Sequence, residues 1–83
     1  MSRYERTLKA VFEDPVGANI RWADIEAMLE SLGAQLSEGR GSRLRVALGG
    51  VKAVFHRPHP RKDAPKHTVR AVRRFLTEAG IQP

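Results

Sequence analysis

Three histidines are the side chains of this chain best suited to moving a proton near neutral pH. His56 and His59 flank Arg57-Pro58, and His67 follows further along. Cleavage of RNA without a metal needs a base for the 2′-hydroxyl proton, an acid for the leaving 5′-oxygen and cations that hold the phosphate. Because His56 and His59 lie inside a basic segment, we take both as candidate catalytic residues.

Each candidate histidine also has a purely structural interpretation. At a strand end the His56 ring can donate to a neighbouring carbonyl, and the His59 ring can pack between prolines and fix the turn. A metal site would need a third ligand, and the nearest carboxylate, Asp63, would have to fold back across Pro60. The chain has no cysteine, which excludes a disulfide scaffold and a zinc ribbon. We expect neither a metal nor a cofactor.

Charge is distributed unevenly along the 83 residues. Residues 1–38 carry four basic and seven acidic side chains, a net −3, whereas residues 39–83 carry eleven basic and two acidic ones, a net +9. A segment this basic attracts polyanions, because each phosphate that Lys or Arg neutralises releases condensed counterions. The simpler alternative, that these side chains only solvate one face, stays open. The candidate RNA- or phosphate-binding residues are Arg43, Arg45, Arg57, Arg61, Lys62, Lys66, Arg70, Arg73 and Arg74.

Two short amphipathic helices are predicted in the first part of the chain. The first covers residues 2–13, where apolar side chains recur at helical spacing until Asp14-Pro15 breaks the pattern. The second runs from Trp22 to Leu32 by the same criterion. We expect Asn19 to cap its N-terminus and Gly33 to end it.

Three short antiparallel strands and a last helix are predicted after the second helix. The hydrophobic period changes from 3.6 to 2 in three stretches between residues 34 and 56, and Gly49-Gly50 permits a tight hairpin turn. Three prolines within residues 56–65 exclude a central strand or a helix there. Helical spacing then returns and ends at Gly80. The predicted class is therefore α+β.

Several of these pieces, in this order, resemble the HicA toxins of bacterial type II toxin–antitoxin systems. They are the helix from Trp22, the pair Gly41-Ser42 before a strand, the hairpin, and the run from His59 to Thr68, which is similar to the family's His-Pro, Lys, Pro and Thr pattern. The resemblance covers about residues 22–81. In the family a catalytic histidine follows the Gly-Ser pair, whereas Arg43 stands at that position here.

The resemblance implies a fold like that of a double-stranded-RNA-binding domain, with a core of one helix, three strands and one helix. We therefore expect a three-stranded antiparallel sheet packed on helices, with an additional N-terminal helix. We expect one domain over residues 1–83, divided into a helical extension at 1–16 and a HicA-like core at 20–81. The resemblance also implies an RNA-binding toxin that acts on messenger RNA as an interferase, and an acidic HicB-like antitoxin that holds it inactive.

Two functional hypotheses from different classes stay open. In the first, the chain is a metal-independent messenger-RNA endoribonuclease in which His56 or His59 has taken over proton transfer. In the second, it is a binding module that holds RNA, or an acidic partner, and cuts nothing. A DNA-binding role ranks third, because the outward side chains of the last helix are nearly all arginine and offer little discrimination between bases.

The hydrophobic pattern also excludes a membrane-spanning segment. No apolar run in the sequence comes near the roughly 18 residues that span a bilayer, and the N-terminal residues lack the apolar stretch of a signal peptide. We therefore expect no membrane association and a cytoplasmic location.

Overall fold

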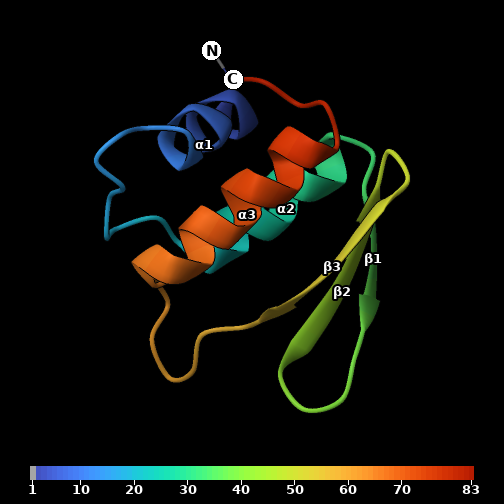
Figure 1. Cartoon of the computed structure of the whole chain (residues 1–83). Coiled ribbons are helices and arrows are strands. Elements are labelled where there is room, and N and C mark those ends of the chain that lie inside the picture. Colours follow the sequence, from blue (N-terminus) through green and yellow to red (C-terminus); the bar gives the residue numbers. More distant parts are fainter. Residues whose placement is uncertain (1) are drawn as a thin grey trace.

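The helices and the sheet form two layers. The structure, a computed structural model, describes residues 2–83. Its elements follow in the order α1 (Arg3–Val11), α2 (Trp22–Ser31), β1 (Gln35–Glu38), β2 (Arg43–Leu48), β3 (Val51–His56) and α3 (Lys66–Glu78). All of these helices lie on one side of the sheet, whose other face is left uncovered (Figure 1). The predicted α+β class, with the core order α-β-β-β-α, is confirmed.

The first helix begins at a serine cap and packs against the rest of the helical layer. Ser2 Oγ accepts a hydrogen bond from the Glu5 N–H at 3.2 Å, which satisfies one of the unpaired donors of the first turn. Glu5 also places a negative charge at the positive end of the helix dipole. At the other end, Val11 is completely buried among the helices. The helix therefore belongs to the packed layer and contributes to the hydrophobic core.

The expected cap of α2 at Asn19 is wrong. The helix begins at Trp22, with Arg21 at the N-cap position and no side-chain cap. The cause is a tertiary contact, because residues 20–22 pair with residues 62–64 through backbone hydrogen bonds of 2.8 and 2.9 Å. This pairing keeps the chain extended up to Arg21, so the helix starts beyond the reach of the Asn19 side chain.

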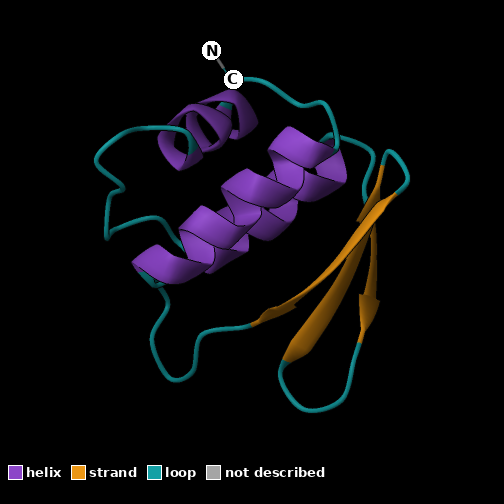
Figure 2. Ribbon diagram, viewed as in Figure 1, coloured by secondary structure: helices purple, strands orange, loops and turns teal. Residues whose placement is uncertain are grey.

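The sheet is antiparallel throughout, with the strand order β1-β2-β3. Gly49 and Gly50 join β2 to β3 with positive φ angles of 57° and 80°, the backbone that a tight two-residue hairpin turn requires. The long loop of residues 57–65 then leads from β3 across to the start of α3, as Figure 2 shows. The turn joins β2 and β3 into one hairpin, whose register places their outward side chains on one open surface.

Aromatic rings connect the sheet to the helical layer. Phe55 on β3 packs edge-to-face against Trp22, with the ring centroids 6.1 Å apart, and against Phe75, at 5.9 Å. Trp22 is 6% exposed and lies in the core. Fully buried aliphatic side chains complete the core: Ile25, Met28 and Leu29 from α2, and Val69, Val72 and Leu76 from α3.

A matched pair of substitutions tests the two faces of the sheet. Val46 on β2 is 2% exposed and Val54 on β3 is 54% exposed. We expect Val46→Ala to lower the free energy of unfolding by about 2–3 kcal/mol, because it removes buried methyl groups and leaves a cavity. Val54→Ala should cost less than about 1 kcal/mol. Urea denaturation measures both values, and equal losses would contradict the assignment of the two faces.

Candidate functional site

The outer face of the sheet is basic, whereas its inner face is apolar. Successive residues of a strand point to opposite sides, so alternate cross-strand pairs share a face. The inner pairs include Leu44 with Phe55 and Val46 with Ala53, and these face the helices. The outer pairs are Arg43 with His56, Arg45 with Val54, and Ala47 with Lys52. The register of one hairpin therefore gathers basic side chains on the surface that no helix covers.

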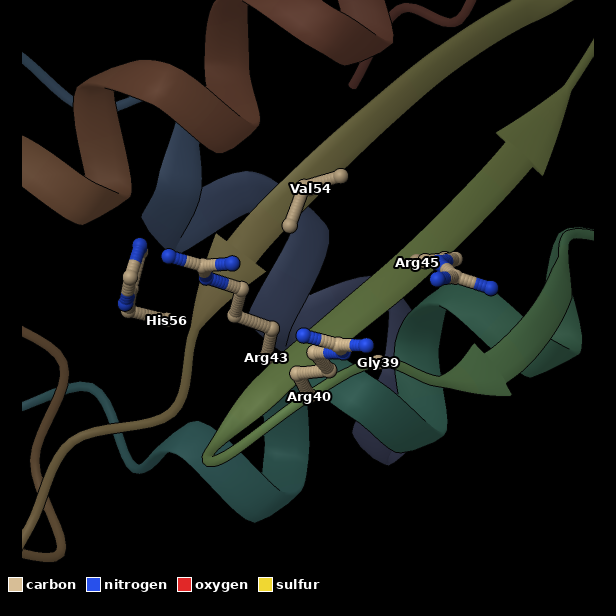
Figure 3. A pocket seen from close by; sticks show the side chains of 6 residues that line it. All are labelled: Gly39, Arg40, Arg43, Arg45, Val54 and His56. Carbon is tan, nitrogen blue, oxygen red and sulfur yellow. The ribbon is translucent and has the colours of Figure 1, made fainter.

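Three of these outward side chains and the neighbouring Arg40 form a cluster where β2 begins and β3 ends. Arg40, Arg43, Arg45 and His56 line a shallow pocket together with Gly39 and Val54 (Figure 3). Arg43 lies directly across from His56 in the β2–β3 register. We call Arg40, Arg43, Arg45 and His56 the outer-face cluster. It contains three of the side chains that the sequence predicted as site residues.

A tight turn between β1 and β2 brings Arg40 into the outer-face cluster. The Gly39 N–H donates to the Arg43 carbonyl at 2.9 Å, and the Arg43 N–H donates back to the Arg40 carbonyl at 3.3 Å. Gly41 reverses the chain between them with a positive φ of 64°, which a residue without a Cβ adopts without strain. The connection of residues 39–42 is thus a closed turn that holds Arg40 beside Arg43.

The positive charge of the outer-face cluster has no counter-charge among the described residues 2–83. The lining of its pocket includes no carboxylate, and the ion pairs found in this part of the chain both involve Arg57 instead. Cations gathered without a counter-charge raise the local potential and attract anions. Arginine is also the side chain whose planar fork best matches the oxygens of a phosphate.

Arg57, a predicted phosphate-binding residue, is engaged with two carboxylates. Its Nε donates to Glu26 Oε2 at 2.8 Å, and its Nη1 and Nη2 donate to the two oxygens of Glu38 at 2.6 and 2.9 Å. The hydrogen bond with Glu38, followed by that with Glu26, raises the pKa of Arg57. The same hydrogen bond lowers the pKa of Glu38. We call Arg57, Glu26 and Glu38 the Arg57 clamp.

The Arg57 clamp fixes the surroundings of the outer-face cluster. Glu26 lies on α2, Glu38 ends β1, and Arg57 directly follows His56 at the end of β3. The Arg57 N–H also donates to the Ser42 carbonyl at 2.8 Å, just before β2 begins. One residue therefore connects the helical layer to the ends of all three strands, next to His56.

Arg73, another predicted phosphate-binding residue, supports α1. Its Nε donates to the Val11 carbonyl at 2.9 Å and its Nη2 donates to the Glu13 carbonyl at 2.5 Å. These carbonyls lie at the C-terminal end of α1, where the helix leaves acceptors unpaired and where a positive charge is favourable. The guanidinium of Arg73 thus attaches α1 to α3.

The remaining predicted residues lie away from the outer-face cluster. His59 is exposed in the loop after β3 and is not part of the lining around Arg43. Around the start of α3, a second basic surface is formed by Arg61, Lys62, Lys66 and Arg70, with Asp63 and His67 among them. Arg74 is exposed further along α3. Of the two candidate histidines, the structure brings His56 and not His59 to Arg43 and Arg45.

Two basic residues of the outer face were not predicted as site residues from the sequence. Arg40 lies in a glycine-rich connection, whose conformation no periodicity reveals. Lys52 could have been found, because the alternation of β3 places it on the same face as Val54 and His56. The alternation of side chains along the second strand of the hairpin is the pattern that indicates its position.

Neither a group of metal ligands nor a membrane-spanning helix occurs among residues 2–83. Within this range, no three His, Cys, Asp or Glu side chains come together in a group that could hold a metal ion. None of the helices in the same range combines the length and the hydrophobicity that crossing a bilayer requires.

The α+β core and its sequence place the chain in a class of bacterial toxins. Residues 22–81, from the start of α2 to beyond α3, match a family model described as the HicA toxin of bacterial toxin-antitoxin. The class is therefore that of toxins that are paired with an antitoxin. Since the match covers more than half of the chain, the chain belongs to the HicA toxin family. No curated protein and no solved structure matches it.

The pH dependence of stability tests the Arg57 clamp. The pKa of Glu38 is lowered in the folded chain, so its ionised form favours folding above the unfolded-state pKa of about 4.3. Wild type should therefore melt at a higher temperature than Glu38→Gln at pH 7, and the difference should vanish as pH falls through the lowered pKa. Thermal melts between about pH 2 and pH 7 measure this. Glu30→Gln, which alters an exposed α2 carboxylate outside the clamp, is the control. A pH-independent difference for Glu38→Gln would contradict the clamp.

Proposed function

We propose that this toxin binds messenger RNA through the phosphate backbone, at the outer face of its sheet. The observation that carries the proposal is the outer-face cluster, three arginines and a histidine on an uncovered surface, with no carboxylate in the pocket lining. Each guanidinium can donate two parallel hydrogen bonds to one phosphate. An open sheet face also admits a continuous strand, which a closed cavity would exclude.

The composition of the outer face supports recognition of phosphates and not of bases. Its outward side chains on β2 and β3 are basic apart from Ala47 and Val54. The rings of Trp22, Phe55 and Phe75 are buried, so they offer no platform on which bases could stack. The second basic surface around Lys66 offers further cations to an RNA backbone, apart from the outer-face cluster. We therefore propose binding that is tolerant of sequence and sensitive to RNA shape.

The family assignment supports a specific kind of regulation. A toxin of this class is paired with an antitoxin, and we propose an acidic HicB-like protein that covers the basic outer face. Carboxylates of the partner would then neutralise the same arginines that hold RNA. In this proposal both proteins act in the cytoplasm, where messenger RNA is translated. The same charges also favour the alternative, a module that holds an acidic partner and does not bind RNA. Titration with RNA distinguishes this alternative from the proposed function.

The salt dependence of RNA affinity tests the proposal. We expect the affinity of wild type to fall steeply with salt, because phosphate contacts release counterions. In the Arg43→Ala/Arg45→Ala variant the slope of log affinity against log salt should become shallower by about 1.5, for two lost contacts. Fluorescence anisotropy with a labelled RNA measures both slopes.

A charge-matched variant controls for the loss of two positive charges. Arg3→Ala/Arg6→Ala removes two exposed arginines from α1, a helix that packs on α2 and α3 and lies away from the uncovered face of the sheet. Its salt slope should stay within experimental error of wild type. A flat salt response of wild type, or an equal loss in both double variants, would overturn the assignment of RNA to the outer face.

A further inference from the structure

An open pocket of about 600 Å³ lies between α1 and the segment that leads into α2. Arg3, Arg6 and Ala10 line it from one face of α1, because residues three and four positions apart are neighbours on a helix. Arg21 and Asp24 line it from the start of α2. We call it the α1–α2 pocket. Its volume falls within the range of about 300–1,000 Å³ that is typical of small-molecule sites.

Basic side chains gather in the α1–α2 pocket although this half of the chain is acidic. Residues 1–38 carry four basic side chains against seven acidic ones. Three of the four, Arg3, Arg6 and Arg21, line this one pocket, whose lining contains a single carboxylate, that of Asp24. The guanidinium groups of these three arginines take part in no hydrogen bond or salt bridge found within residues 2–83. Their N–H donors are therefore available to an anion.

Both walls of the α1–α2 pocket are held by contacts with the rest of the chain. Arg73 of α3 donates to the carbonyls of Val11 and Glu13, which fixes the end of α1. On the other wall, residues 20–22 pair with residues 62–64 through backbone hydrogen bonds of 2.8 and 2.9 Å. The elements that carry the arginines are therefore placed before a ligand arrives, so binding requires less ordering of the chain.

The charges around the α1–α2 pocket favour a compact anion over a long one. Residues 1–38 carry a net charge of −3, which repels an extended polyanion such as RNA, whereas the pocket itself holds three cations against one carboxylate. The N-terminus of α2, between Arg21 and Asp24, borders the same pocket and has no side-chain cap. The helix dipole there adds to the attraction for an anion.

We propose that the α1–α2 pocket binds a nucleoside diphosphate. The three arginines hold its two phosphates through charge-assisted hydrogen bonds. Asp24, whose carboxylate only accepts hydrogen bonds, takes those of the ribose hydroxyls or of an amino group of the base. Ala10 and the largely buried Ile20 supply an apolar floor for the organic part of the ligand. Inorganic phosphate would leave both Asp24 and this floor unused.

This site is separate from the surface proposed for RNA. Arg3, Arg6 and Arg21 lie outside residues 22–81, the part of the chain that matches the HicA family model. Figure 1 shows α1 and its connection to α2 on the helical side of the molecule, away from the uncovered face of the sheet. Nucleotide binding here therefore does not depend on RNA binding at the outer-face cluster, and each can be tested without the other.

Titration of the ¹⁵N-labelled full chain with ADP, followed by amide chemical shifts, tests the proposal. We expect the largest changes on residues 3–10 and 19–24, and tighter binding of ADP than of inorganic phosphate or adenosine. Arg3→Ala/Arg6→Ala should bind ADP at least about 10-fold more weakly, because it loses charge-assisted hydrogen bonds. Since both side chains are exposed, this variant should melt as wild type does. Asp24→Asn should narrow the preference for ADP over inorganic phosphate.

The matched control is Arg43→Ala/Arg45→Ala, which removes two arginines from the outer face and should bind ADP as wild type does. A 2′-O-methyl RNA, whose blocked 2′-oxygens prevent cleavage, is titrated into both double variants. We expect RNA binding to weaken only in the outer-face variant and ADP binding to weaken only in the pocket variant.

The outcomes separate the nucleotide site from the proposed function. Absence of ADP-induced changes on residues 3–10 and 19–24, or an equal loss of ADP binding in both double variants, overturns the nucleotide site. ADP that binds no more tightly than inorganic phosphate overturns the nucleotide as the ligand. Wild type that binds ADP as expected but not the 2′-O-methyl RNA overturns the proposed function and supports the nucleotide site.

Discussion

The Arg57 clamp is the interaction on which the arrangement of the site depends. It joins residues that are 19 and 31 positions apart in the chain and that belong to β1, to α2 and to the end of β3. The same residue binds the backbone before β2. The hairpin alone sets which residues face each other, but the clamp sets where the open end of that hairpin sits relative to the helices.

One face of the sheet contributes to stability, and the other is the surface proposed to bind RNA. Inward side chains of β2 and β3 are apolar and meet the aromatic cluster of Trp22, Phe55 and Phe75. Outward side chains of the same strands are mostly basic and lie on the face that no helix covers. Because the period of a strand is two, a shift of one residue in register would exchange the faces and lose both properties. The register is therefore as important to the proposed RNA surface as the residues themselves.

Local periodicity was enough to predict the fold class, and the charge of residues 39–83 was enough to name Arg43 and Arg45 as candidate phosphate-binding residues. It failed wherever a long-range contact decides the outcome. Arg57 and Arg73 were grouped with the phosphate-binding residues, yet their partners lie 19 to 62 positions away, and no pattern near them reveals those partners. The expected cap at Asn19 fails on the same ground, because the distant pairing of residues 20–22 with residues 62–64 decides where the helix begins. The spacing of His56 and His59 could not rank them, whereas the β2–β3 register brings one of them to Arg43.

The central claim is that RNA meets this toxin on the outer face of the sheet. Titration of ¹⁵N-labelled protein with the 2′-O-methyl RNA, followed by amide chemical shifts, tests it most directly. The account predicts that the largest changes fall on residues 39–45 and 52–56, which carry the outer-face cluster and Lys52. Changes confined to α1, or to residues 61–70 around the start of α3, would contradict it.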